Sequence, residues 1–98
     1  MNKILVVEDD PAVQRVLRRL FEPEEFTIEV TADGKSALDK FRSAPPSAVI
    51  LDLRLPDTSG SEVCREIKKQ APALPVIVLS AKTDVIMTVH GAGYKFLA

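Results

Sequence analysis

The chain has 98 residues, of which 46% are apolar and 28% charged, and its formal net charge is -1. This size allows one domain with one core, and the composition is that of an ordinary globular protein rather than a disordered or fibrous one. Neither a basic stripe nor an apolar run of membrane length is present, so we expect no nucleic-acid binding by this chain alone, no membrane insertion and a cytoplasmic location.

Four short apolar runs predict β-strands that alternate with helical patterns. Parallel strands that are buried on both faces appear in a sequence as continuous apolar runs. The alternation with helices therefore favours an α/β fold built on a parallel sheet. The four runs are Lys3–Val7, Thr27–Thr31, Ala48–Asp52 and Val76–Ser80.

The clearest helix is predicted directly after the first strand. Its apolar residues recur three and four positions apart and so share one face, which consists of Val13, Val16, Leu17, Leu20 and Phe21. Asp10 is suited to cap this helix, and Pro11 to occupy its first position, where a missing N–H costs nothing. The helix should therefore begin next to the acidic residues that follow the first strand.

Two more helices are predicted from the same spacing. Asp33 and Gly34 open one of them, and it ends before Pro45. The other covers about residues 61–70 and is stopped by Pro72.

Acidic residues stand at the ends of two of the predicted strands. Glu8 and Asp9 follow the first strand, and Asp52 closes the third. Open α/β sheets build their sites at the carboxyl ends of the strands, so neighbouring strands would bring the three carboxylates into one pocket. Two unit charges about 4 Å apart repel by roughly 4 kcal/mol at an effective dielectric near 20. Such a cluster calls for a cation, and a hard divalent metal is the natural choice.

Three segments in this order resemble the receiver domain of bacterial two-component response regulators. They are residues 4–10 (ILVVEDD), 49–60 (VILDLRLPDTSG) and 76–82 (VIVLSAK). The resemblance covers about residues 1–84 and implies a flavodoxin-like, doubly wound parallel sheet with strand order 2-1-3-4. The fifth strand and the last helix of the family are not recognisable. This implies a truncated receiver in residues 1–84 and a tail, a β-hairpin or a substitute strand, in residues 85–98.

The resemblance also implies a role for each residue of the acidic cluster. Asp52 would be the phosphoacceptor and would take a phosphoryl group from a sensor histidine kinase. Mg²⁺ would be held by Asp9, Asp52 and the backbone carbonyl of Arg54. Glu8 would act through a bound water, and the hydroxyl of Ser80 would donate to a phosphoryl oxygen. No enzymatic activity is implied beyond self-phosphorylation and slow self-dephosphorylation at Asp52.

The tail admits two interpretations. Residues 87–96 (MTVHGAGYKF) are similar to the last β-hairpin of the winged-helix domain that follows receivers of the OmpR/PhoB class. Alternatively, residues 94–98 form a fifth strand that stops before the lysine with which the family contacts the phosphoryl group. That lysine is missing under both interpretations, so we expect impaired phosphorylation.

Loss of the last helix would leave part of the first helix uncovered, because both helices cover the same sheet face in the family. Each large aliphatic side chain left in water forfeits roughly 1.5–3 kcal/mol. We therefore expect a homodimer or a segment-exchanged oligomer, in which the tail adds to the Val76–Ser80 edge of its own subunit or of another.

Two other functions compete with the receiver hypothesis. One is a non-phosphorylated interaction or dimerisation module derived from a response regulator. The other is a hydrolase that uses Asp52 as a nucleophile, but such enzymes place a second acid where Arg54 stands.

Overall fold

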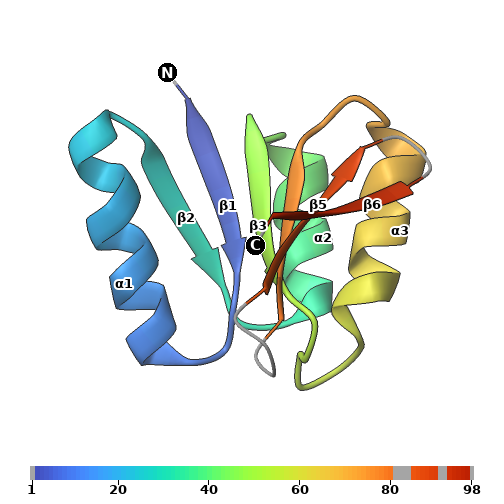
Figure 1. Ribbon diagram of the computed structural model, residues 1–98, viewed down its shortest axis with the longest axis horizontal. Coiled ribbons are helices and arrows are strands. Elements are labelled where there is room, and N and C mark those ends of the chain that lie inside the picture. The colour runs from blue at the N-terminus through green and yellow to red at the C-terminus, as the bar shows by residue number, and fades with distance from the viewer. Residues whose placement is uncertain (1, 81–84, 91–92, 98) are drawn as a thin grey trace.

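The computed structural model describes the backbone of residues 2–80, 85–90 and 93–97 and the side chains of residues 2–79. Within these residues the chain forms one six-stranded sheet with α-helices on both faces (Figure 1). The elements, in chain order, are β1 (Lys3–Val7), α1 (Pro11–Phe21), the 3-10 helix η1 (Glu22–Glu24), β2 (Thr27–Thr31), α2 (Gly34–Ser43), β3 (Ala48–Asp52), α3 (Gly60–Gln70), β4 (Val76–Ser80), β5 (Val85–His90) and β6 (Gly93–Leu97).

The order of the strands across the sheet is β2-β1-β3-β4-β5-β6. The first four strands are parallel to their neighbours, which confirms the predicted flavodoxin-like α/β sheet with order 2-1-3-4. Each of these strands has the predicted bounds, because each predicted apolar run is one buried parallel strand.

The last two strands extend this sheet in the opposite direction. β5 pairs antiparallel with β4, and β6 pairs antiparallel with β5. The β5 strand thus lies on the β4 edge of its own chain. The division of the chain at residue 84, and the likeness of the tail to a winged-helix hairpin, stay predictions.

Alternate residues of the central strands point to opposite faces of the sheet. On β1, Leu5 and Val7 pack with α2 and α3, whereas Ile4 and Val6 pack on the α1 side. The first core also contains residues of β3, β4 and the two helices, namely Ala37, Phe41, Val49, Leu51, Val63, Cys64, Ile67, Val76 and Val78. This two-sided burial is the reason why the strand sequences are apolar without alternation.

Each α-helix begins at a side chain that caps it. Asp10 accepts a hydrogen bond from the N–H of Ala12 and Pro11 is the first residue of α1, as predicted. Asp33 caps α2 through the N–H of Ser36. Ser59 accepts from the N–H of Glu62, so α3 begins at residue 60, one residue earlier than predicted. Among the described residues, no helix is long and apolar enough to cross a membrane.

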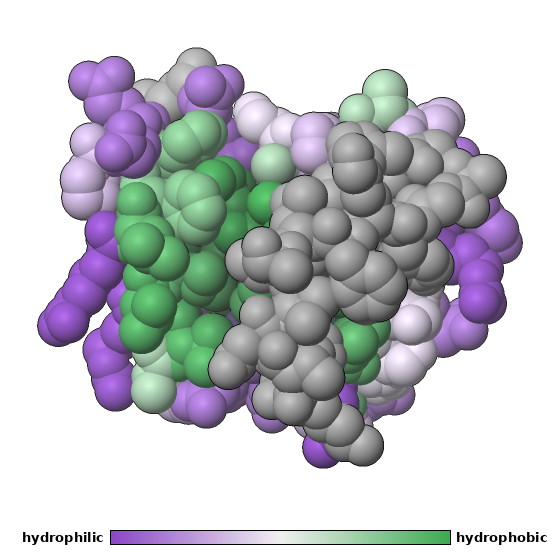
Figure 2. All heavy atoms as spheres, viewed as in Figure 1, coloured by the Kyte–Doolittle hydropathy of each residue, from purple (hydrophilic) through white to green (hydrophobic). Residues whose placement is uncertain are grey.

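The α1 helix covers only part of its sheet face. Leu17 is buried against the sheet, but Val16 is 55% exposed and Leu20 is 60% exposed. Within residues 2–79, α1 is the only α-helix that contributes to the core on this side. Figure 2 shows the apolar side chains that gather over α1 and the neighbouring strands. Partial exposure of the predicted apolar stripe is therefore a feature of this fold.

Candidate functional site

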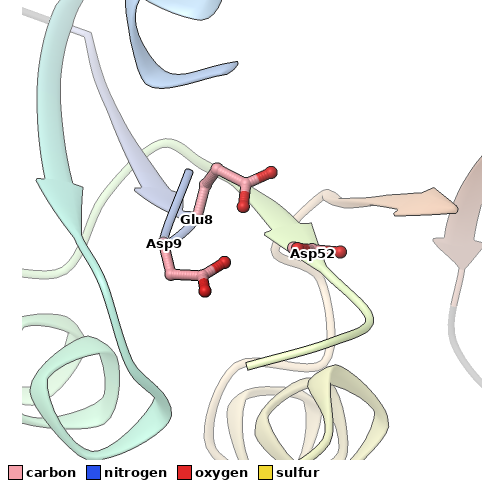
Figure 3. A group of neighbouring side chains, drawn as sticks. All are labelled: Glu8, Asp9 and Asp52. Atoms are coloured by element: carbon pink, nitrogen blue, oxygen red, sulfur yellow. The ribbon is translucent and has the colours of Figure 1, made fainter. Parts of the chain in front are cut away.

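Three carboxylates meet at the carboxyl edge of β1 and β3. Val7 lies opposite Leu51 in the parallel register, so the residues that follow them in the chain come together. Glu8, Asp9 and Asp52 each offer a carboxylate oxygen, and these oxygens all lie within 4.8 Å of one another (Figure 3). The structure thus brings together the three acids that the sequence predicts at one pocket.

The backbone and side chain of Glu8 are fixed by several hydrogen bonds. Its N–H donates to the carbonyl of Thr31 (2.9 Å), and its carbonyl accepts from the side-chain amide of Gln14 (2.5 Å). Its carboxylate accepts from the N–H of Asp10 (3.2 Å). These contacts with β2 and α1 hold the acid in one orientation.

The environment of Glu8 disfavours its ionised form. Only 5% of the residue is exposed. Burial raises the pKa of Glu8 to about 7, the neighbouring Asp52 and Asp9 also raise it, and the hydrogen bond from Asp10 opposes the shift. A bound cation would favour the ionised form of Glu8, because it would offset the charge of the neighbouring acids.

Asp52 is also buried, whereas Asp9 is exposed. One carboxylate oxygen of Asp52 accepts a hydrogen bond from the N–H of Arg54 (3.2 Å). The site thus has two buried acids at its base and one acid at its opening to solvent.

The loop between β3 and α3 returns tightly to the end of β3. Leu53 donates its N–H to the carbonyl of Leu79 (3.3 Å) and accepts a hydrogen bond from the N–H of Gly60 (2.8 Å). Arg54 and Ser59 form an antiparallel bridge. A Cβ at residue 60 would collide with the backbone carbonyl of Asp52 and lie 2.8 Å from the Cα of Leu53. Glycine is required here because the start of α3 touches the backbone of the strand end.

The tip of this loop is attached to a different helix. The two carboxylate oxygens of Asp57 accept hydrogen bonds from the N–H groups of Gly34 (2.8 Å) and Lys35 (3.0 Å) at the start of α2. These two bonds lower the pKa of Asp57. Sequence reasoning missed Asp57, since an aspartate in a turn gives no signal for a contact with a helix 23 residues away.

For two of the predicted site residues, Arg54 and Ser80, the structure does not describe a contact of the predicted group with the cluster. Arg54 follows Asp52 directly in the loop, and its N–H rather than its carbonyl is the group with a defined contact to the cluster. The backbone of Ser80 ends β4, next to the β3 strand, but its side chain lies outside the described residues. The roles assigned to both stay predictions.

The donor set of the cluster suits a hard cation. Three carboxylates supply only oxygen atoms, and Mg²⁺ prefers oxygen ligands and takes one or two carboxylates together with waters and phosphate oxygens. Among residues 2–79, no lysine or arginine forms an ion pair with any of the three acids. A divalent metal is thus the fitting counter-charge.

Comparison with known proteins agrees with the fold. Residues 4–96 match the family model described as the response regulator receiver domain. The chain belongs to this family. Response regulator MprA of Mycolicibacterium vanbaalenii is 42% identical over 89 residues, which are 91% of this chain and 38% of that protein. The chain thus spans less than half the length of this relative.

Solved structures of response regulators superpose well on the chain. The response regulator TrrA of Thermotoga maritima, in complex with Mg(2+)-BeF, has a TM-score of 0.80 and 37% identity, over 85% of this chain and 72% of that chain. TrrA in complex with the histidine kinase ThkA has a TM-score of 0.78 at the same identity and coverage. The chain is therefore a receiver with the flavodoxin-like fold of two-component signalling.

Proposed function

We propose that this chain is a phosphoacceptor module of a two-component phosphorelay, in which Asp52 receives the phosphoryl group. The observation that carries the proposal is the convergence of Glu8, Asp9 and Asp52, whose carboxylate oxygens lie within 4.8 Å of one another. Asp52 ends β3, which pairs with β1 on one side and with β4 on the other, so its backbone is held within the sheet.

The reaction is a transfer from nitrogen to oxygen. A carboxylate oxygen of Asp52 attacks the phosphorus of a phosphohistidine and forms a new P–O bond. The P–N bond breaks, and its electron pair returns to the imidazole nitrogen of the kinase. The product is an acyl phosphate on Asp52. In such transfers the protein mainly positions the groups and offsets their charge.

The residues of the cluster would hold the metal. We assign Mg²⁺ to Asp9, Asp52 and the backbone carbonyl of Arg54, with Glu8 acting through a bound water. When bound, Mg²⁺ offsets the charge of the carboxylates and of the incoming phosphoryl group. TrrA, which is similar to this chain, is known in complex with Mg(2+)-BeF, and this supports the assignment.

Two further contacts complete the proposal. The hydroxyl of Ser80 would donate to a phosphoryl oxygen from the end of β4. A sensor histidine kinase would be the donor, which is supported by the complex of the similar regulator TrrA with the histidine kinase ThkA. We expect labelling to be slow, because the lysine with which the family contacts the phosphoryl group is not recognisable in the sequence.

The test is phosphorylation by a small phosphodonor with Mg²⁺, followed by intact mass measurement. The protein should gain one phosphoryl group, and Asp52→Asn should gain none. Asp39→Asn, which changes an exposed aspartate on α2, is the matched control and should be labelled like the parent. Labelling of Asp52→Asn, or rapid turnover of many equivalents of donor by the parent, would contradict the proposal.

One observation favours a second function. The exposed side chains of Val16 and Leu20 are suited to an interface, as expected of an interaction module that is not phosphorylated. Absence of labelling together with stable self-association would favour this function.

A further inference from the structure

We propose that Asp57 is a positioning residue that holds the β3–α3 loop, and with it the backbone of Arg54, in the geometry that binds the metal. The inference rests on the proposed function, because it concerns the metal site assigned to Asp9, Asp52 and Arg54.

The first argument is the geometry of the Asp57 carboxylate. Both of its oxygens are used, one by the N–H of Gly34 (2.8 Å) and the other by the N–H of Lys35 (3.0 Å). These are the first two residues of α2, where N–H groups have no partner inside the helix. A carboxylate at this end of a helix is also stabilised by the helix dipole. The contact therefore ties the loop to α2 with two charge-assisted hydrogen bonds.

The second argument is that α2 does not need Asp57 as its cap. Asp33 already caps the helix, because its side chain accepts a hydrogen bond from the N–H of Ser36 (2.7 Å). The bonds of Asp57 instead join two elements that are separate in the chain. This contact acts on the loop more than on the helix.

The third argument is the close fit between the loop and α2. A Cβ at residue 34 would collide with the methyl group of Thr58 and lie 2.9 Å from a methyl group of Val63. Glycine at this position lets the loop approach the helix. The loop and the start of α2 are thus matched in shape as well as in charge.

The other bonds of the loop act at its base. The Leu53–Gly60 hydrogen bond and the Arg54–Ser59 bridge close the loop on itself. Among the described hydrogen bonds, those of Asp57 attach the tip of this loop to α2. Arg54 lies between the rigid end of β3 and this attached tip, and its backbone is therefore constrained from both sides.

Loss of the Asp57 hydrogen bonds should weaken metal binding, because fewer molecules would then have the loop in the geometry that binds the metal. The apparent affinity of a ligand falls in proportion to the fraction of molecules in the binding-competent state. Outer contacts that orient metal ligands typically change the affinity by about 10–100-fold. Asp57 acts one contact further away, so we expect Asp57→Ala to raise the Kd for Mg²⁺ by about three- to tenfold.

The experiment is a calorimetric titration of the full chain with MgCl₂ near pH 7.5. The variants are Asp57→Ala, Asp57→Asn, which keeps one acceptor, and Asp9→Asn, which removes a metal ligand. Asp33→Ala is the matched control, because it removes a cap from the same helix end without touching the loop. Urea denaturation of every variant verifies folding, and amide hydrogen exchange of Gly60 reports on the base of the loop.

The inference is supported if Asp57→Ala weakens Mg²⁺ binding and speeds amide exchange at Gly60. The Mg²⁺ affinity of Asp57→Asn should lie between those of Asp57→Ala and the parent. Asp33→Ala should lower the stability and leave the Mg²⁺ affinity unchanged. The inference is overturned if the Asp57 variants bind Mg²⁺ as the parent does, or if Asp33→Ala weakens binding equally. A parent chain that binds no Mg²⁺ would overturn the proposed function and this inference together. Parent binding that Asp9→Asn abolishes and Asp57→Ala leaves intact would overturn this inference alone.

Discussion

Glu8 makes the stability of the metal-free protein depend on pH. Its ordinary pKa of 4.5 is raised to about 7 in the folded state, first by burial and then by the neighbouring aspartates. Between these two values the folded chain holds a proton that the unfolded chain has lost. Because stability falls with rising pH wherever the folded state binds more protons, the contribution of Glu8 is complete below pH 4.5 and is lost by about pH 7.

We therefore expect the Glu8→Gln variant to be less sensitive to pH than the parent. Urea denaturation without metal, at pH 5 and at pH 7.5, measures the difference in free energy of unfolding for each protein. The parent should lose more stability than Glu8→Gln over this interval. Glu24→Gln, which changes an exposed glutamate, is the control and should behave as the parent does. An equal loss of stability in the parent and in Glu8→Gln would show that Glu8 is not the source of the pH dependence.

Asp52 should limit stability when no metal is bound. One of its carboxylate oxygens lies within 4.8 Å of a carboxylate oxygen of each of the other two acids. At an effective dielectric near 20, two unit charges at such a distance repel by roughly 3 kcal/mol, and the exposure of Asp9 reduces this value. We expect Asp52→Asn to raise the free energy of unfolding by about 1–2 kcal/mol at pH 7.5 without Mg²⁺. The amide oxygen can still accept from the N–H of Arg54.

Chemical denaturation with and without Mg²⁺ checks this prediction. Excess Mg²⁺ should stabilise the parent more than Asp52→Asn, because a ligand stabilises only the state that it binds. A variant that is less stable than the parent in the absence of metal would show that repulsion at the cluster is not the dominant effect.

At the scale of the elements, two glycines begin helices beside the site and differ in what surrounds them. Gly60 starts α3 against the backbone of Asp52 and Leu53, which cannot move without displacing β3. Gly34 starts α2 against the methyl groups of Thr58 and the buried Val63, which are stiff β-branched side chains that can shift only slightly. The two positions are therefore a matched pair for testing how closely the loop is packed.

We expect Gly60→Ala to lower the stability more than Gly34→Ala does. Overpacking costs about 1–3 kcal/mol, so Gly60→Ala should lower the free energy of unfolding by at least about 2 kcal/mol. For Gly34→Ala the clash is with side-chain methyl groups, which can shift slightly where a backbone carbonyl cannot, so the loss should be smaller, about 1 kcal/mol. Urea denaturation measures both values, and equal losses would refute the difference in packing.

The strands could be predicted from the sequence because strands that are buried on both faces appear as continuous apolar runs. All four predicted runs are strands with the predicted ends, and the acids at two of those ends converge. The caps Asp10 and Asp33 were also predictable, since they act on the residues that follow them in the chain.

The missed features depend on contacts between distant segments. Asp57 binds the start of α2 only because the sheet brings the two loops together. The short η1 helix is followed by Glu25, which has a left-handed backbone with φ of 66°. The sequence has no glycine at this position, so it gave no signal for the turn. The pKa of Glu8 likewise depends on burial and on neighbours from another strand.

At the scale of the whole molecule, the face that carries α1 is incompletely covered. Val16 and Leu20 are more than half exposed, although their spacing in the sequence is that of a buried apolar face. Transfer of such a side chain from water to an apolar contact is worth roughly 1.5–3 kcal/mol. Two copies that cover each other's stripe would gain this energy twice, so the face favours self-association.

The last two strands offer a second way in which the chain could self-associate. β5 pairs with β4 of its own chain, and β6 forms the outer edge of the sheet. An unpaired edge is a template for another strand, and a terminal segment can exchange between subunits without new kinds of contact. The oligomer that we expect from the sequence could therefore form through the apolar stripe or through the last two strands.

Light scattering over a concentration series distinguishes these cases. We expect the parent to form dimers at high micromolar concentration. Leu20→Lys should make the protein monomeric if the apolar stripe is the interface, because the substitution places a charge where side chains would pack. Arg19→Gln, a change of an exposed residue on the same helix, should leave the dimer intact. A dimer that persists in Leu20→Lys would point to exchange of β5 and β6. A parent that stays monomeric at all concentrations would refute self-association.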